Sequence, residues 1–279
     1  MTFYANAKLN LSLDITERRD DGYHNIVSEM QEIDLSDTVA IEINRNHDEI
    51  RVNCDNPRIP TDERNIAYST AKLFLQTAGL KFGVDINIKK RIPLMAGLGG
   101  SSTDGATVLK GLNEMCDSDS KIDFKRYSID ELCKLGARLG ADVPFCIVGG
   151  RAECRGIGDI ITPLPDLPAQ FYVIVQPDFY CDTKSAYELF AKRESRYGRK
   201  GTITKATATA NIFQRLYNDE RIERICEEML NLGAGSASMT GSGSAVFGVF
   251  PTDELAENAL ERMNQPFKYK AKNVKTVLS

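Results

Sequence analysis

The chain of 279 residues carries a formal net charge of −4 and contains 42% hydrophobic residues. This length suits a globular protein of about two domains with a large core, and the pI near 5.4 argues against general binding to nucleic acid or membrane surfaces. Seven scattered cysteines without a Cys-x-x-Cys pair, together with the lack of an apolar run long enough to cross a bilayer, favour a cytoplasmic protein.

Residues 3–15 alternate between apolar and polar side chains, which predicts a strand. Lys8 and Asn10 fall on the same polar face, two residues apart, where both could meet one ligand. The alternative for this face is simple exposure to solvent.

Two further strands are predicted over residues 39–43 and 50–54, running antiparallel across a polar connection. Asp62 can cap the helix that follows, and Gly79 is placed to end it. Residues 84–88 form another alternating strand, which leads to a turn rich in glycine.

That turn joins the strand ending near Lys90 to an amphipathic helix. Gly97, Gly99 and Gly100 allow main-chain N–H groups to approach an anion closely. Ser101, Ser102 and Thr103 add hydroxyl donors just before a predicted helix, which points its unpaired N–H groups and its positive dipole end at the same anion. We therefore predict a phosphate-binding loop over residues 93–103, with a connection that binds nothing as the alternative.

Ser128 and Glu131 have the spacing of a capping box and predict a helix with an apolar stripe at Ile129, Leu132, Leu135 and Leu139. Asp142 follows, between the helix end and an apolar segment expected to be a strand. The alternative for this aspartate is a turn former.

Prolines between residues 163 and 168 mark an expected domain junction. Beyond it the pattern is strand, helices, two strands, helix and strand, which is the order of a ferredoxin-like layer. The basic segment 192–205 is expected to be a solvated loop.

Three separated motifs are Ala5-x-Ala7-Lys8-x-Asn10-Leu11, Pro93-x-x-x-Gly97-Leu-Gly-Gly-Ser-Ser102 and Thr240-Gly-Ser-Gly243-Ser-Ala-Val-Phe247. Together they resemble the signature of the GHMP kinases, the family of galactokinase, homoserine kinase and mevalonate kinase. The segments 18–24, 35–38 and 140–145 are similar to the branch of this family that acts on CDP-methylerythritol. The resemblance covers nearly the whole chain and thins between residues 192 and 220.

The resemblance implies a two-domain α+β fold with the active site in the cleft between the domains. Residues 1–160 would form a ribosomal-protein-S5-like α/β domain, and residues 161–279 a ferredoxin-like domain. The implied reaction is ATP-dependent phosphorylation of the 2-hydroxyl of CDP-methylerythritol, in the non-mevalonate route to isoprenoid precursors. Mg²⁺ would be carried by ATP, and the protein would be a monomer or weak homodimer.

Residue roles follow from the same resemblance. Asp142 corresponds to the general base, Lys8 to the group that holds it and the reacting oxygens, and Asn10 to a substrate-positioning residue. Tyr23 would stack on cytosine, and His24 would read its polar edge. The further substrate-binding positions are Met30 and two alternatives for a second stacking aromatic, Phe179 and Tyr180. The ATP-binding positions are Asn65, Lys90, Pro93, Leu94, Met95, Ala96, Gly97, Leu98, Gly99, Gly100, Ser101, Ser102 and Thr103.

Two rival functions are a kinase of this family acting on another alcohol, and a nucleotide-binding regulator that transfers no phosphate. Tyr23 and His24 argue against the first, because they match a cytosine-binding pair. Lys8 and Asp142 argue against the second, because a regulator has no need of either.

Overall fold

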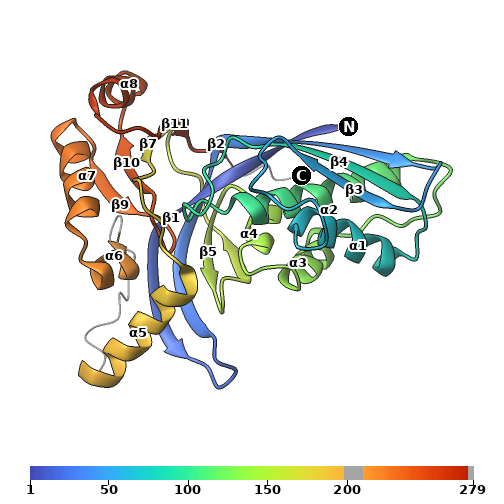
Figure 1. The fold of residues 1–279 in the computed structure, drawn as a ribbon, viewed down its shortest axis with the longest axis horizontal. Helices are drawn as coiled ribbons and strands as arrows, with labels where there is room; N and C mark the ends of the chain where they lie inside the picture. The colour runs from blue at the N-terminus through green and yellow to red at the C-terminus, as the bar shows by residue number, and fades with distance from the viewer. Residues whose placement is uncertain (198–209, 276–279) are drawn as a thin grey trace. The chain divides into compact units, whose positions relative to one another are not determined.

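The protein, described here by a computed structural model over residues 1–197 and 210–275, forms two compact units (Figure 1). The first consists of Met1–Ala7, Ser36–Ile92 and Gly99–Val148, and the second takes in Lys8–Leu35, Pro93–Leu98 and the chain from Gly149 onward. Strands β1 (Thr2–Arg18) and β2 (His24–Asn44) contribute residues to both units. Each unit is made of several segments of the sequence, so no single boundary divides them. The predicted domain boundary at residue 160 stays a prediction.

In the first unit, strand β4 (Gly83–Lys89) lies between the C-terminal half of β2 and strand β3 (Ile50–Cys54). Thr38 is opposite Lys89 in the antiparallel β2–β4 pair, whereas β3 and β4 are parallel. The predicted strands therefore do run antiparallel, but they are not neighbours. The reason is the helix between β3 and β4, which carries the chain back so that the two strands pair in parallel.

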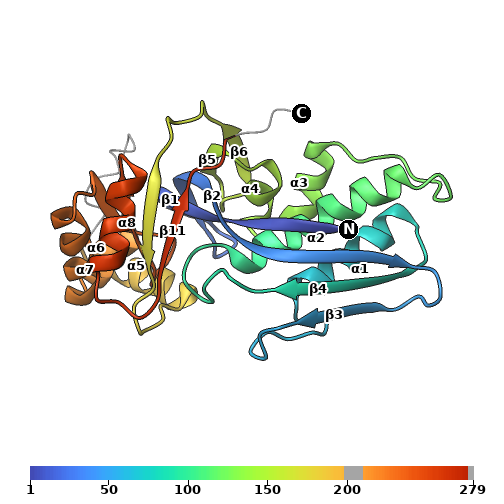
Figure 2. The same ribbon diagram turned by 90° about the horizontal axis from the view of Figure 1, so that it is seen from above.

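Helices α1 (Ile66–Ala78), α2 (Gly100–Ser118), α3 (Ile129–Ala137) and α4 (Val143–Val148) lie on one side of these strands (Figures 1 and 2). Helices α1 and α2 approach closely because Gly105 has no side chain: a Cβ there would lie 3.1 Å from Ile66 Cγ1. The buried side chains that fill this unit include Ile41, Phe74, Ile86, Leu109 and Leu112.

The predicted ends of the helices are partly right. The capping box of Ser128 and Glu131 is confirmed, and Gly79 ends α1 in the left-handed conformation with φ 67°. The predicted start of α1 is wrong, because Asn65 rather than Asp62 accepts a hydrogen bond from the Ala67 N–H, at 2.8 Å. Asp62 instead accepts from the Arg64 N–H, one turn too early to cap the helix.

The segment after Asp142 is a helix, α4, and not the predicted strand. Pro144 did not prevent it, because proline is tolerated in the first turn of a helix, where its missing N–H has no partner to lose. The run of apolar residues from Val143 to Ile147 is buried on all sides, so its periodicity did not distinguish helix from strand.

In the second unit, strand β5 (Arg151–Arg155) pairs with β2 and with β6 (Ile160–Pro163). Strand β8 (Ala210–Asn211) adds to β1 in parallel, with Ser12 opposite Ala210. These short strands were not predicted.

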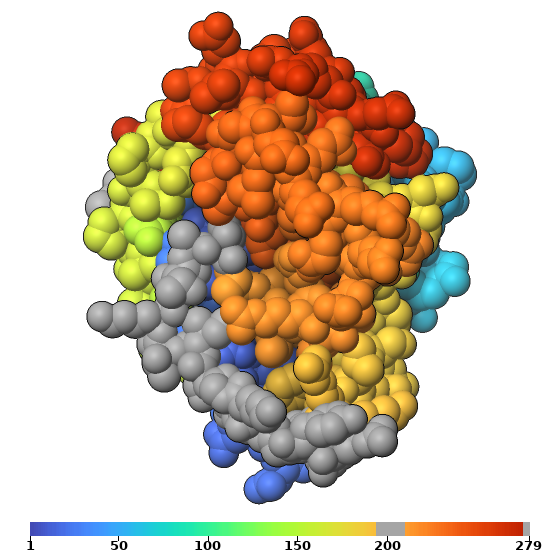
Figure 3. Space-filling model, turned by 90° about the vertical axis from the view of Figure 1, so that its left-hand side faces the viewer, coloured from blue at the N-terminus to red at the C-terminus, as the bar shows by residue number. Residues whose placement is uncertain are grey.

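The rest of this unit is the predicted ferredoxin-like layer. Strands β7 (Phe171–Val175), β9 (Ser236–Met239), β10 (Val246–Phe250) and β11 (Lys268–Lys272) pair in the order β11-β7-β10-β9, with every pair antiparallel. Helices α7 (Glu220–Asn231) and α8 (Asp253–Arg262) pack against this sheet, and Figure 3 shows their outer surface.

Two more helices complete the second unit, α5 (Thr183–Tyr197) and α6 (Ile212–Tyr217). Because α5 runs to Tyr197, the start of the basic segment 192–205 is helical and not the predicted loop. Residues 198–205 of that segment lie outside the described residues. No helix within residues 1–197 and 210–275 is long and apolar enough to span a membrane.

The stripe predicted on α3 provides a test of the packing. Leu132 is 2% exposed and Ile129 is 46% exposed, although the sequence placed both in the core. We expect Leu132→Ala to lower the free energy of unfolding by about 2–5 kcal/mol, because it leaves a cavity. Ile129→Ala should cost less than about 1 kcal/mol. Urea unfolding of both variants measures the difference, and equal losses would contradict this description of α3.

Candidate active site

Residues 93–98, the first half of the predicted phosphate loop, belong to the second unit and are held there by hydrogen bonds from other segments of that unit. The Lys8 N–H donates to the Leu98 carbonyl at 3.1 Å, and the Ala245 N–H donates to the Ala96 carbonyl at 3.2 Å. The side chain of Gln176 donates to the Leu94 carbonyl at 2.9 Å. The structure thus brings together parts of the three motifs that are far apart in the sequence.

Gly97 makes the closest of these approaches. Its φ is 76°, and a Cβ there would lie 2.3 Å from the carbonyl oxygen of Thr240. A Cβ at Gly241 would in turn lie 3.0 Å from the Gly97 carbonyl oxygen. Only glycine fits at Gly97, because both the backbone conformation and the space exclude a side chain.

Residues 99–103, the second half of the loop, belong to the first unit and form the start of α2. Gly99, the N-cap residue, is left-handed with φ 72° and makes no side-chain hydrogen bond to the helix. By contrast, α1, α3, α7 and α8 are each capped by a polar side chain. The uncapped N–H groups of α2 suit an anion, since the helix dipole favours negative charge there.

Helix α2 begins at Gly100, earlier than predicted, so Ser101, Ser102 and Thr103 lie within its first turn. The hydroxyl of Thr103 donates to the Asn6 carbonyl at 2.7 Å, and its N–H donates to the Gly99 carbonyl. Thr103 therefore fixes the helix against β1. The donors left for a phosphate come from Gly100 to Ser102.

The Lys90 ammonium lies buried between two carboxylates, Asp37 on β2 and Asp104 on α2. The bond to Asp104 is 2.6 Å long. Asp37 also accepts from the N–H groups of Arg91 and Ile92, so the chain entering the loop is held by one carboxylate. Lys90 was predicted to lie near the nucleotide, and that stays a prediction. Its ammonium already forms ion pairs with the two carboxylates.

The two carboxylates differ in their hydrogen bonding. Asp37 has three donors, whereas among the described residues Asp104 Oδ1 has no hydrogen-bond partner. Burial raises the pKa of Asp104 to about 7, with the nearby charge of Asp37 adding to the effect and Lys90 opposing it. For Lys90, burial lowers the pKa, but Asp104 and Asp37 outweigh it and hold the pKa above its usual value.

Lys8 and Asn10 lie on β1 in the second unit, and both are buried. The alternative of a solvated face for Lys8 is therefore wrong. The Lys8 ammonium donates to Asn10 Oδ1 at 2.6 Å, and the Asn10 N–H donates to Thr240 Oγ1 at 2.9 Å. Asn10 Nδ2 donates to Ser28 Oγ at 2.8 Å, so Asn10 is held at three points.

Asp142 lies in the first unit between α3 and α4, where its carbonyl accepts from the Cys146 N–H at 3.1 Å. The segment before it lies near the start of α2, since a Cβ at Gly140 would be 3.9 Å from Ser102 Oγ. Within this unit Asp142 and the second half of the phosphate loop are thus near one another in the fold. The joint action of Asp142 with Lys8 stays a prediction.

The residues predicted to bind cytosine belong to the second unit. Tyr23 lies in the turn before β2 and is 61% exposed, which leaves its ring available for stacking. His24 begins β2 and stacks on Tyr187 of α5, with ring centroids 5.2 Å apart. Phe190 meets the same imidazole edge-on.

The sequence did not single out Tyr187. An aromatic residue on a helix is usually part of the core, and its spacing to His24 carried no signal. Of the two predicted alternatives for a second aromatic, Tyr180 is exposed, while the Phe179 ring lies under the Arg221 guanidinium at 3.8 Å.

Two other predicted site residues are buried or hydrogen-bonded within the protein. Met30 is only 1% exposed on β2, which leaves little surface for a ligand. Asn65 uses its amide to cap α1 and to donate to the Pro60 carbonyl at 2.7 Å. Their contacts with substrate and adenine stay predictions.

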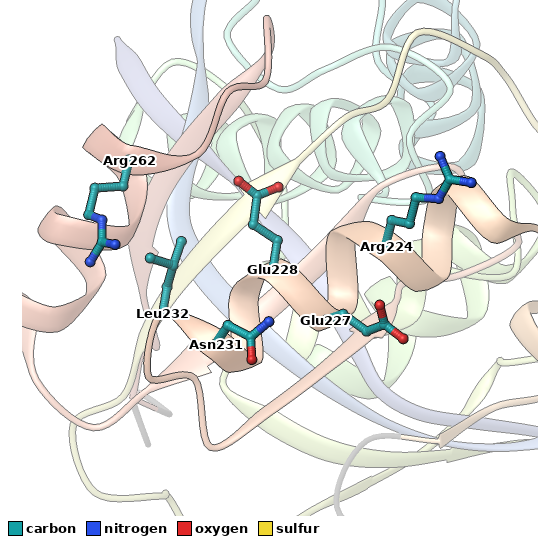
Figure 4. A pocket seen from close by; sticks show the side chains of 6 residues that line it. All are labelled: Arg224, Glu227, Glu228, Asn231, Leu232 and Arg262. Atoms are coloured by element: carbon teal, nitrogen blue, oxygen red, sulfur yellow. The ribbon is translucent and has the colours of Figure 1, made fainter.

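Two surface cavities of the second unit lie away from the three motifs. One, of about 410 Å³, is lined mainly by side chains of α7, among them two glutamates, with Arg224 and Arg262 on opposite sides of them (Figure 4). The other, of about 380 Å³, includes Phe179 and Arg221. Apart from Phe179, neither contains a predicted site residue. Within residues 1–197 and 210–275, no group of three His, Cys, Asp or Glu side chains gathers to hold a metal ion.

The approach of Gly97 to Thr240 leads to one prediction. Gly97→Ala should weaken ATP binding at least about tenfold, because its Cβ would displace the Thr240 backbone and with it the loop. Gly79→Ala is the matched control: Gly79 has a similar φ of 67° but nothing within 4 Å of the added Cβ. It should lose about 1–2 kcal/mol of stability and leave ATP binding unchanged. Calorimetric titration tests both variants, and parental affinity in a folded Gly97→Ala protein would contradict this role.

The protonation of Asp104 leads to another prediction. The folded protein keeps this proton up to about pH 7, whereas the unfolded chain loses it near the ordinary value of 3.8. The folded state therefore binds more protons over this window, and Asp104 makes the free energy of unfolding fall as the pH rises.

We expect Asp104→Asn to lose less stability than the parent between pH 5 and pH 8, measured by urea unfolding. Asp117→Asn, an exposed change on the same helix, should keep the parental dependence. Identical pH dependence in the parent and Asp104→Asn would contradict the protonated form of Asp104.

Comparison with known families gives matches along the chain. The GHMP kinase N-terminal domain matches residues 65–150, and the GHMP kinase C-terminal domain matches residues 204–268. A solved structure, the crystal structure of 4-(cytidine 5'-diphospho)-2C-methyl-D-erythritol kinase, is similar with a TM-score of 0.79 and 29% identity, over 98% of this chain and 99% of that one. The mevalonate kinase of Methanococcus jannaschii, at 17% identity and a TM-score of 0.73, shares the fold over 99% of this chain and 98% of that one.

Curated relatives are similar over almost their whole length. The 4-diphosphocytidyl-2-C-methyl-D-erythritol kinase of Clostridium tetani is 40% identical, covering 96% of this chain and 97% of the relative. The protein of the same name from Caldicellulosiruptor saccharolyticus is 40% identical, covering 94% and 92%. With both GHMP kinase domains and relatives of this identity, the chain belongs to the 4-diphosphocytidyl-2-C-methyl-D-erythritol kinase family of the GHMP kinases.

Proposed function

We propose that the protein transfers the γ-phosphate of ATP to the 2-hydroxyl of 4-diphosphocytidyl-2-C-methyl-D-erythritol, CDP-methylerythritol. The observation that carries this is the 40% identity to kinases of that name over nearly the full chain. The uncapped start of α2 and the loop held against the third motif supply the structural support for phosphate binding. The reaction belongs to the non-mevalonate route to isoprenoid precursors.

In this proposal the two halves of the phosphate loop bind and orient ATP through main-chain N–H groups. Phosphoryl transfer depends on such positioning and on neutralising charge. Mg²⁺, brought in by the nucleotide, supplies part of that neutralisation. Residues 93–98 also give the loop the shape that surrounds the phosphates.

Asp142 is the proposed general base, and Lys8 orients the hydroxyl and offsets the developing charge. Asn10 holds the Lys8 ammonium through a short charge-assisted hydrogen bond. The proposal requires that Lys8 and Asp142 act on the same hydroxyl.

Substrate choice rests on Tyr23 and His24. The exposed ring of Tyr23 offers a stacking face, and His24 is held by its contact with Tyr187. Stacking contributes about 1–3 kcal/mol per base, so this pair can distinguish a cytidine conjugate from a bare polyol phosphate. A kinase for another alcohol would gain nothing from the pair.

We also propose a cytoplasmic enzyme that acts as a monomer or weak homodimer on small molecules, without nucleic-acid or membrane partners. The acidic balance of the chain and its scattered cysteines support this.

The function is tested by ATP consumption with and without CDP-methylerythritol, and with methylerythritol phosphate as a cytosine-free control. We expect turnover only with CDP-methylerythritol. Asp142→Asn keeps the size of the side chain but cannot accept the proton, so its kcat should fall by about 10²–10⁴ while ATP still binds.

Two outcomes would favour the alternative functions, and a third would change the role of Asp142. Equal use of the cytosine-free alcohol indicates another kinase of the family, and ATP binding without turnover indicates a regulator. A folded Asp142→Asn protein with more than about a tenth of the parental kcat, when chemistry limits the rate, removes Asp142 from the role of base.

A further inference from the structure

A buried chain of hydrogen bonds in the second unit runs from the Lys8 ammonium through Asn10 to Ser28. We propose that Ser28 is a positioning residue for phosphoryl transfer, acting on Lys8 through Asn10. The inference rests on the proposed function, in which Lys8 orients the reacting hydroxyl.

At Ser28 the donor and acceptor of each hydrogen bond are fixed. Ser28 lies on β2 with no exposed surface, and its hydroxyl donates to the Ser12 carbonyl at 2.7 Å. A serine hydroxyl has a single proton, so the side of the oxygen that meets Asn10 can only accept. The amide nitrogen of Asn10 is the donor there, at 2.8 Å.

The Lys8 end imposes the same direction independently. An ammonium can only donate, so the Asn10 amide must present its oxygen to Lys8. Both ends thus require one orientation of this amide, with Oδ1 toward Lys8 and Nδ2 toward Ser28. The backbone of Asn10 is held as well, by its bond to Thr240 Oγ1.

Removal of the Ser28 hydroxyl would leave Asn10 Nδ2 buried without its acceptor, which is costly. The side chain relieves this by rotating toward another acceptor, and that rotation carries Oδ1 away from the Lys8 ammonium. The ammonium then loses a charge-assisted bond that fixes its position. Among the described residues, Ser28 has no hydrogen bond to the phosphate loop, so ATP binding should not change.

The experiment compares Ser28→Ala with Ser12→Ala in steady-state kinetics with ATP and CDP-methylerythritol. Both changes remove a buried serine hydroxyl from neighbouring strands, but Ser12 Oγ accepts from the Glu29 N–H and does not bond to the Asn10 amide. We expect kcat to fall roughly tenfold in Ser28→Ala, with the KM for ATP within about twofold of the parent. Ser12→Ala should keep kcat within about twofold.

A double-mutant cycle separates positioning from a merely structural role. If Ser28 acts through Asn10, Ser28→Ala should cause no further loss of kcat in the Asn10→Ala background. Should Ser28→Ala fail to fold, Ser28→Cys, which is close in size and bonds more weakly, should give an intermediate loss of kcat.

A folded Ser28→Ala protein with parental kcat would overturn the inference. So would a loss that recurs in full in the Asn10→Ala background. Both results compare the kcat of a variant with that of an active parent protein. Failure of the proposed function would instead appear as a parent protein without activity on CDP-methylerythritol.

Discussion

The first unit depends on one ammonium that serves two buried carboxylates. Lys90 at the end of β4 joins Asp37 of β2 to Asp104 of α2, so three elements meet at a single charge. A buried ion cluster is weak evidence for added stability, because desolvation offsets much of the attraction. Its effect is on position: it ties the residue that follows β4 to β2 and to the start of α2.

The second unit fixes its half of the phosphate loop by a different means. There the main chain of Gly97 lies directly against that of Thr240, and the bond from Lys8 N–H to Leu98 adds β1 to the contact. Hydrogen bonds between backbones need no particular side chain, but close approach does require glycine. This explains why the second and third motifs contain glycines and no charged residue, although the ligand is highly charged.

Features with a local signal could be predicted from the sequence, and features made by distant partners could not. The alternation of β1, the capping box at Ser128 and the order of the ferredoxin-like layer are local, and all are confirmed. The Asp37–Lys90 pair spans 53 positions, and nothing in its spacing indicates it. The contact of Tyr187 with His24 was missed for the same reason, since these residues are far apart in the chain. The cap of α1 at Asn65 is local, and it was missed because Asp62 is an equally suitable capping residue nearby.

The passage of β1 and β2 through both units has a consequence for the order in which the chain folds during synthesis. The first unit has all its residues once Val148 has been made. Part of the second unit, Lys8–Leu35, is synthesised earlier, but the unit is complete only after the segments from Gly149 onward have been made. Domains made on the ribosome usually fold as consecutive stretches. Here the early strands must remain without part of their final neighbours while the rest of the chain is translated, so chaperones have a longer interval in which to bind them.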